Sequence, residues 1–99
     1  MLNINKTVTG EKAELALSGR LDTVTAPELE SAVKESIDGV KELTFDFGNL
    51  EYISSAGLRV LLSAQKIMNA QGEMKVRNVN ETIMEIFDVT GFSDILTIE

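Results

Sequence analysis

A chain of 99 residues that is 43% hydrophobic has room for one domain with one core, so we expect a single domain spanning residues 1–99. The chain contains 16 acidic and 9 basic residues, and its formal charge of -7 disfavours nucleic acid and anionic membrane surfaces as partners. It has neither cysteine nor histidine, which excludes disulfide bonds, thiolate metal sites and serine–histidine–aspartate hydrolysis. The missing histidine weighs against a hydrolase, and we expect a protein that is not an enzyme.

The N-terminal segment gives an expectation about location. Residues 1–6 contain no basic region followed by an apolar stretch. No part of the chain approaches the roughly 18 apolar residues that a membrane-spanning helix needs. We expect a cytoplasmic protein that does not insert into a membrane.

The first third of the chain predicts a hairpin followed by a helix. Residues 2–8 and 13–18 alternate between apolar and polar side chains, and residues 9–12 have the composition of a turn. Residues 25–28, Thr-Ala-Pro-Glu, have the spacing of a capping box, with a threonine to accept a free backbone N–H and a proline in the first turn. A helix should begin there and end at Gly39.

The middle of the chain predicts a strand, a loop and a long helix. Residues 40–47 read as a strand that ends near Gly48, and residues 49–53 read as a loop. The helix expected over residues 56–70 is apolar around most of its circumference, which is typical of a central helix or of one that contacts a partner. Its narrow polar stripe contains Arg59, Ser63 and Lys66.

The last third predicts one more strand and one more helix. Met74 and Val76 mark the strand, Asn80 should cap the helix, and Gly91 should end it. Residues 94–98 fit either an edge strand or a loose tail. Together these elements predict an α/β fold in which α-helices pack against a mixed β-sheet of four to five strands.

Two serines at the start of the 56–70 helix form the candidate site. A serine there can simply cap the helix, which stabilises it by about 1 kcal/mol. Alternatively, a phosphate on Ser55 would be tolerated beside free N–H groups and would repel an acidic or apolar partner surface. Gly57 would permit a close approach of a partner backbone, with an exposed Leu58 or Leu62 as anchor, although ordinary helix packing explains Gly57 equally well.

Four segments of the sequence resemble the STAS domain of bacterial anti-sigma-factor antagonists. They are Gly19-Arg20-Leu21-Asp22, the run from Asp46 to Leu58, Gly72-Glu73-Met74, and the run from Ile86 to Phe92. The likeness covers nearly the whole chain. It implies a small STAS-type domain that, when unphosphorylated, binds an ATP-dependent anti-sigma factor serine kinase and so releases a sigma factor. It also implies that phosphorylation blocks binding and that a PP2C-type phosphatase restores it.

By position, the resemblance assigns the phosphorylated serine to Ser55. Many such antagonists have aspartate directly before that serine, where this chain has Ser54, and Ala56 replaces a second hydroxyl residue. Ser54 therefore stays a rival acceptor. We prefer Ser55, because Ser54 lies one residue further from the helix and should have fewer backbone N–H partners.

The partner surface predicted from the motifs and the helix start comprises Asp22, Thr23, Ser54, Gly57, Leu58, Arg59 and Leu62. No phosphate-binding loop and no carboxylate cluster with metal-ligand spacing occurs, so we expect neither a cofactor nor a metal. Two alternatives remain open. One is a constitutive scaffold or accessory subunit of a transport or signalling complex, and the other is a nucleotide-binding protein that uses the helix N-terminus as a phosphate cradle.

Overall fold

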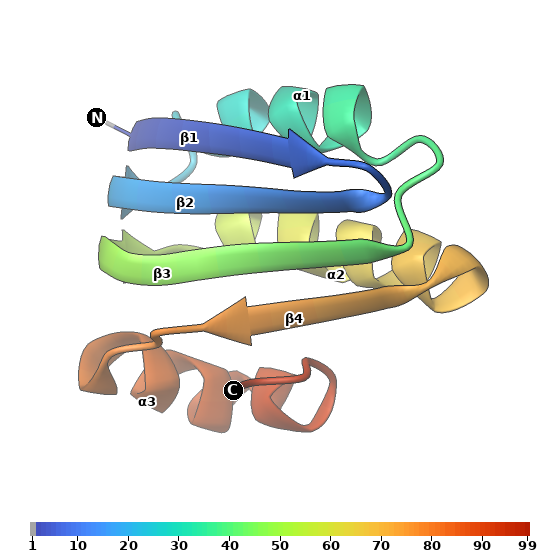
Figure 1. The fold of residues 1–99 in the computed structure, drawn as a ribbon. Coiled ribbons are helices and arrows are strands. Elements are labelled where there is room, and N and C mark those ends of the chain that lie inside the picture. The colour runs from blue at the N-terminus through green and yellow to red at the C-terminus, as the bar shows by residue number, and fades with distance from the viewer. Residues whose placement is uncertain (1) are drawn as a thin grey trace.

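A four-stranded sheet with the strand order β1-β2-β3-β4 forms the centre of the computed structural model, which describes residues 2–99 (Figure 1). Strands β1 (Leu2–Thr9) and β2 (Lys12–Leu21) form the expected antiparallel hairpin. Strands β3 (Glu42–Ile53) and β4 (Glu73–Arg77) then run parallel to β2. The predicted α/β fold with a mixed sheet is confirmed.

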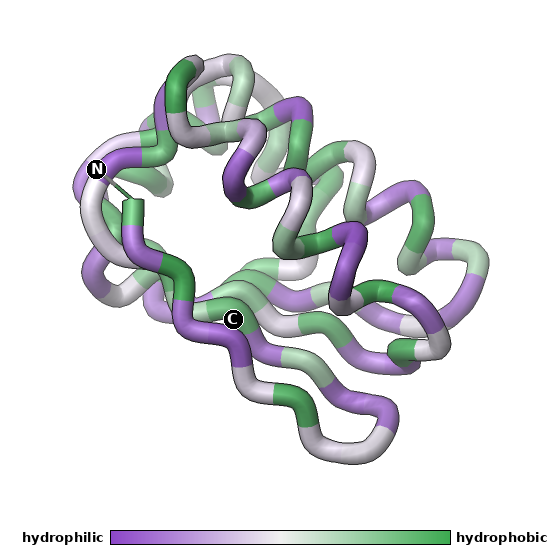
Figure 2. The backbone as a smooth tube through the Cα atoms, turned by 90° about the horizontal axis from the view of Figure 1, so that it is seen from above, coloured by the Kyte–Doolittle hydropathy of each residue, from purple (hydrophilic) through white to green (hydrophobic). Residues whose placement is uncertain are grey.

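Two helices cover one face of this sheet, and the opposite face is open to solvent. Helices α1 (Ala26–Ser36) and α2 (Ser55–Gln71) lie side by side behind the strands in Figure 1, while α3 (Glu81–Thr90) lies beyond the β4 edge. The view from above shows the helices as a second layer on one side of the strands (Figure 2). This arrangement follows from period-two burial in β3, where Leu43, Phe45 and Phe47 are buried and the residues between them are half-exposed.

The core lies between the helices and the sheet, and three phenylalanine rings connect β3 with α3 inside it. The Phe47 ring is 6.1 Å from that of Phe45 and 6.2 Å from that of Phe87, measured between centroids. Phe87 belongs to α3, so these contacts fasten α3 to the rest of the core. Separations of this size are typical of tilted aromatic pairs.

Strand β3 is longer than the sequence predicted, and the expected loop over residues 49–53 is wrong. Leu50 and Ile53 are buried, and this segment continues to pair with β2 through Gly19 and Leu21. The register between β2 and β3 shifts at two places, between Ala16 and Ser18 and between Gly19 and Arg20. These shifts interrupt the alternation of apolar and polar residues by which a strand is recognised in the sequence. The extension brings the chain directly to the start of α2.

Helix α1 begins where expected, but its capping box does not form. Thr25 occupies the N-cap position with a helical backbone (φ -92°, ψ -17°), and its side chain makes no cap hydrogen bond. The threonine hydroxyl bonds instead to the loop before it, as described below. Pro27 does lie in the first turn, and Gly39 follows the helix with a positive φ of 74°.

The last third of the chain follows the prediction except at its end. Asn80 caps α3 by accepting a hydrogen bond from the Ile83 N–H at 2.9 Å, and Gly91 ends it in the left-handed conformation. Residues 94–98 form neither an edge strand nor a loose tail. A short 3-10 turn (η1, Phe92–Asp94) leads to a buried Leu96, and Ile98 forms an isolated parallel bridge with Val76 of β4.

Candidate functional site

The start of α2 meets the loop between β2 and α1 at one end of the sheet. Strands β2 and β3 are parallel and paired up to Leu21 and Ile53, so the loops that follow them leave the sheet at the same edge. The Ser54 backbone N–H donates to the Leu21 carbonyl at 2.8 Å, which ties the two loops together. This is the edge at which α/β folds commonly place binding sites.

The two serines play different structural roles. Ser54 is the N-cap: its backbone is extended, and its hydroxyl accepts a hydrogen bond from the Gly57 N–H at 3.4 Å. Ser55 is the first residue of the helix and is exposed. Our expectation that Ser54 would have fewer backbone N–H partners is wrong, because the capping hydroxyl belongs to Ser54. Ser55 is the serine that presents its side chain to solvent.

Gly57 and Leu58 face the interior. Leu58 is only 5% exposed, so the prediction that it forms an exposed anchor is wrong. A Cβ atom on Gly57 would lie 2.6 Å from Leu21 Cγ and 3.0 Å from Ile53 Cγ1. The packing explanation of Gly57 is therefore the correct one, since its missing side chain lets α2 begin directly on top of the ends of β2 and β3.

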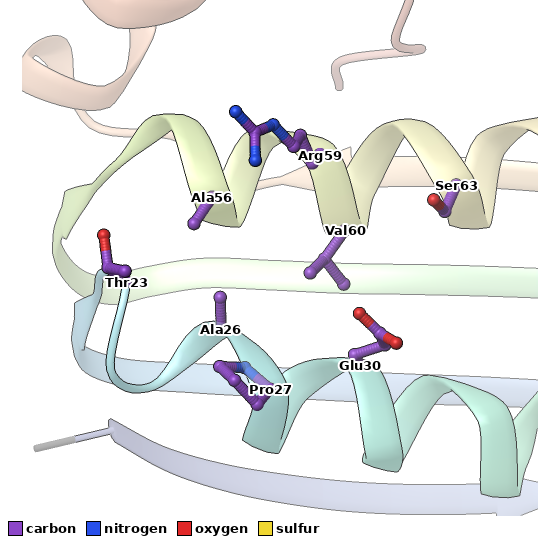
Figure 3. A pocket seen from close by; sticks show the side chains of 8 residues that line it. All are labelled: Thr23, Ala26, Pro27, Glu30, Ala56, Arg59, Val60 and Ser63. Carbon is purple, nitrogen blue, oxygen red and sulfur yellow. The ribbon is translucent and has the colours of Figure 1, made fainter.

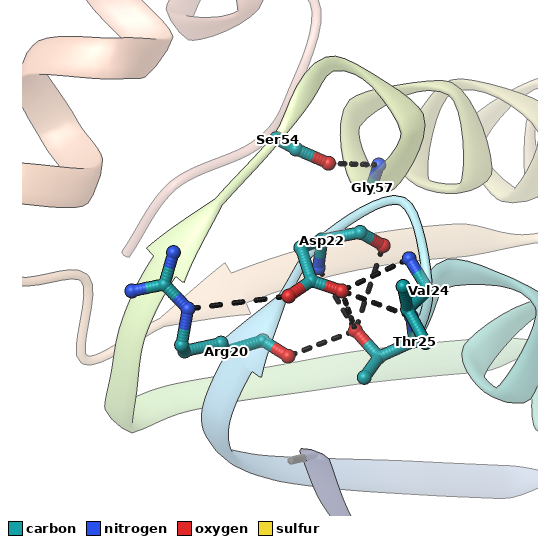
Figure 4. A network of polar contacts seen from close by, with 6 residues as sticks. All are labelled: Arg20, Asp22, Val24, Thr25, Ser54 and Gly57. Atoms are coloured by element: carbon teal, nitrogen blue, oxygen red, sulfur yellow. Dashed lines mark hydrogen bonds and ion pairs between the residues drawn. The ribbon is translucent and has the colours of Figure 1, made fainter.

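The loop after β2 is held by a compact network centred on Asp22 (Figure 4). Asp22 Oδ1 accepts hydrogen bonds from the Val24 and Thr25 N–H groups, both at 3.0 Å. The Thr25 hydroxyl donates to the Arg20 carbonyl and accepts from the Asp22 N–H, both at 2.8 Å. These bonds fix the loop and leave Val24 82% exposed at its tip.

The same contacts keep Asp22 ionised. The hydrogen bond from the Thr25 backbone N–H is the main cause that lowers the pKa of Asp22 below its usual value of 3.8. The Thr25 hydroxyl, the Val24 N–H and the Arg20 guanidinium act in the same direction. Arg20 lies 3.9 Å from Asp22 Oδ2 and also stacks over the Tyr52 ring, 4.6 Å from its centroid. The carboxylate is therefore a fixed negative charge beside the start of α2.

A groove of about 350 Å³ runs between α1 and α2 beside these loops (Figure 3). Thr23 and Ala56 lie at the end nearest the serines, and Val60 lies in the middle. The Arg59 side chain projects from α2 away from α1. A second hollow, lined by Ile67 among others, shares three residues with the groove and extends it along the same two helices.

The structure brings together part of the predicted partner surface. Thr23 and Arg59 are exposed near the start of α2 and Asp22 and Ser54 are half-buried there, while Leu62 is half-buried further along the helix. The sequence reasoning assigned no role at this site to Arg20 or Val24, and it gave Thr25 only the role of a helix cap. A signal was available for Thr25, because a threonine three residues after an aspartate is well placed to join a loop network of this kind.

Two further findings concern the described residues as a whole. Within residues 2–99, no group of three or more acidic side chains is arranged to hold a metal ion. Over the same range, no helix has the length and apolar character needed to cross a membrane.

Comparison with known proteins gives a consistent set of relatives. The family model for the STAS domain matches residues 3–99. The anti-sigma-B factor antagonist of Staphylococcus aureus is 30% identical over 97 residues, covering 96% of this chain and 90% of that protein. An anti-sigma factor antagonist from Mycobacterium paratuberculosis has the same fold, with a TM-score of 0.90, 21% identity, and coverage of 99% and 85% of the two chains. Unphosphorylated SpoIIAA superposes with a TM-score of 0.83 at 20% identity, covering 100% and 88%.

Proposed function

Because this chain belongs to the STAS domain family and is an anti-sigma-factor antagonist of that family, we propose that it is a protein-binding switch gated by phosphorylation of Ser55. Unphosphorylated, it binds an anti-sigma factor that is also a serine kinase, and a sigma factor is released. Phosphorylated, it no longer binds. A PP2C-type phosphatase returns it to the binding state. Since the kinase uses ATP, the cycle takes place in the cytoplasm, and the antagonist itself is a substrate and not an enzyme.

The covalent step is a simple phosphoryl transfer. The γ-phosphoryl group leaves the bridging oxygen of ATP and forms a new bond to Ser55 Oγ, while the hydroxyl proton is released and ADP departs. The phosphatase reverses the modification with water, giving back the free hydroxyl and inorganic phosphate. An acceptor for this chemistry must offer a hydroxyl that a kinase can reach.

The observation that supports the proposal best is that the two serines differ in hydrogen bonding and in exposure. Ser54 already uses its hydroxyl to cap α2 and is half-buried, whereas Ser55 is exposed at the first position of the helix. This favours Ser55 as the acceptor. A phosphorylated form of the related SpoIIAA also shares the fold, with a TM-score of 0.75 at 20% identity and coverage of 100% and 91%, so the fold is compatible with a phosphorylated state.

Phosphorylation should act on the docking surface and leave the domain folded. A phosphate on Ser55 would lie beside the unpaired N–H groups of the first turn and at the positive end of the helix dipole, which favours negative charge. Helix melting is therefore not the expected consequence. The added charge would instead meet a partner that lies across this surface, beside the fixed carboxylate of Asp22.

The proposed contact surface follows from exposure. Side chains that can touch a partner are those of Asp22, Thr23, Ser54, Arg59 and, in part, Leu62. Gly57 and Leu58, which the motif also includes, contribute by setting where the helix begins.

Phosphorylation can be tested with a purified anti-sigma factor serine kinase from the organism that produces this protein. The wild-type protein, Ser54→Ala and Ser55→Ala are incubated with the kinase and ATP, and phosphate is mapped by mass spectrometry. We expect modification of wild type and Ser54→Ala and none of Ser55→Ala. Modification of Ser54 alone would move the switch by one residue, and an absence of phosphate on both serines would overturn the proposal.

Binding gives the second test. Ser55→Asp should bind the same kinase at least about tenfold more weakly than wild type, because it places a charge in a contact that excludes water, whereas Ser55→Ala should bind normally. Isothermal titration calorimetry measures both affinities. Equal affinities for the two variants would instead support a constitutive scaffold in which the serines have only structural roles.

A further inference from the structure

Helix α2 differs in charge from the rest of the molecule. The chain contains 16 acidic residues, yet none of them lies among the 17 residues of α2. The charged residues of this helix are Arg59 and Lys66, and both are exposed. Ser55, Arg59 and Ser63 follow each other at intervals of four residues, so they share one face of the helix. A cationic stripe therefore starts at the proposed phosphorylation site.

The two cations of this stripe are unpaired within the described part of the chain. Between residues 2 and 99, no carboxylate lies within 4.0 Å of the Arg59 guanidinium or the Lys66 ammonium. On α1, in contrast, Lys34 is 3.0 Å from Glu30. Glu30 and Arg59 both line the groove between the helices, but the Arg59 side chain projects away from α1 and the two form no ion pair (Figure 3).

We infer that the Arg59–Lys66 face of α2 is a docking surface for a carboxylate-rich surface of the anti-sigma partner, an inference that rests on the proposed function. Charge complementarity carries it. In a protein with a formal charge of -7, most of the surface repels an acidic partner, and this face is one from which carboxylates are absent. The half-buried Leu62, between the two cations in sequence, supplies apolar contact area beside the charges.

The same geometry links Arg59 to the switch. Residues four apart on a helix are neighbours, so a phosphate on Ser55 comes within reach of the Arg59 guanidinium, and arginine pairs well with phosphate oxygens. Phosphorylation then does two things at once: it adds negative charge to the surface, and it occupies the cation that would otherwise pair with the partner. Arg59 is on this account a specificity-determining residue whose availability depends on the state of Ser55.

The test measures affinity for the partner kinase by calorimetry at two salt concentrations. Arg59→Gln and Lys66→Gln are compared with Lys6→Gln, which removes an exposed cation from β1 and gives the same net charge. At about 50 mM salt we expect each α2 variant to bind roughly fivefold more weakly than wild type and Lys6→Gln to stay within about twofold. At about 500 mM salt the differences should shrink, because screening weakens charge pairs.

A double-mutant cycle tests the link to the switch. Ser55→Glu should weaken binding less in the Arg59→Gln background than in wild type, because the arginine that the acidic side chain occupies is already absent. Three results would overturn the inference: Arg59→Gln binding as tightly as wild type, a loss that is insensitive to salt, or additive effects of the two substitutions. If wild type binds and Ser55→Asp abolishes binding while Arg59→Gln is unchanged, the inference fails and the proposed function stands. If wild type does not bind at all, both fail.

Discussion

Replacing Gly57 by alanine should destabilise the domain, even though alanine is the better helix former. The added Cβ would lie 2.6 Å from Leu21 Cγ, 2.9 Å from Leu21 Cδ2 and 3.0 Å from Ile53 Cγ1. Carbon atoms in contact prefer separations of about 3.5 to 4.0 Å, so either α2 or the two side chains must move. Leu21 is completely buried, and Ile53 is almost completely buried, which leaves little space for that movement.

The balance of two effects sets the magnitude. An extra methyl group in a tight core costs about 1 to 3 kcal/mol, and alanine recovers at most about 1 kcal/mol in helix propensity. We expect a net loss of about 1 to 2 kcal/mol in the free energy of unfolding. For a domain of this size that corresponds to a decrease of roughly 5 to 15 °C in the melting temperature.

Urea and thermal unfolding followed by circular dichroism measure this loss. The matched control is Gly48→Ala, where a new Cβ would be 3.2 Å from a carboxylate oxygen of Asp46 and 3.6 Å from Asn78, in an exposed position. The control should change stability by less than about 0.5 kcal/mol. In a Leu21→Ala background, Gly57→Ala should cost much less than in wild type, since the two nearest clashing atoms both belong to Leu21. A neutral or stabilising Gly57→Ala would refute the packing argument.

Two more predictions concern stability. Asn80→Ala should lower the free energy of unfolding in urea by about 1 to 2 kcal/mol, because it removes both the cap on the Ile83 N–H and the bond to the Leu50 carbonyl at 2.8 Å. A loss below about 0.3 kcal/mol would contradict this. In the folded protein the pKa values of Asp22 and Asp46 lie below the usual 3.8, and the main cause for Asp46 is the hydrogen bond from the Asn78 side chain. The stability that these carboxylates provide is therefore present above pH 3.8 and is lost as the pH falls through their pKa values in the folded state. Wild type should therefore lose more stability than Asp46→Asn between about pH 5 and pH 2, and parallel losses would argue against the assignment.

Local patterns in the sequence were sufficient for most of the fold. Alternation predicted the hairpin, and the helix boundaries at Pro27, Asn80 and Gly91 were recognisable because proline, asparagine and glycine act through their own backbone and the nearest turn. The same local reasoning identified the helix start at the two serines. The resemblance to the STAS family, based on four short segments, is confirmed by the family model over residues 3–99.

Local patterns failed wherever a distant partner decided the outcome. The second half of β3 looks like a loop until β2 lies beside it. Thr25 is a local exception, because its hydroxyl bonds to the Arg20 carbonyl and the Asp22 N–H, three to five residues earlier, and does not cap the helix. Gly57 and Leu58 belong to a motif that was predicted to form a partner surface, yet both are buried, and Gly57 lies against Leu21 and Ile53.

The sequence by itself determined the fold class, the helix that carries the two serines and the unusual absence of carboxylates from that helix, because composition and periodicity are properties of the chain alone. Only the tertiary structure decided which serine caps and which is exposed, and which motif residues lie at the surface. Those outcomes depend on where α2 begins relative to β2 and β3. That position is fixed by packing between segments more than 30 residues apart, such as Leu21 and Gly57, and no local pattern encodes it.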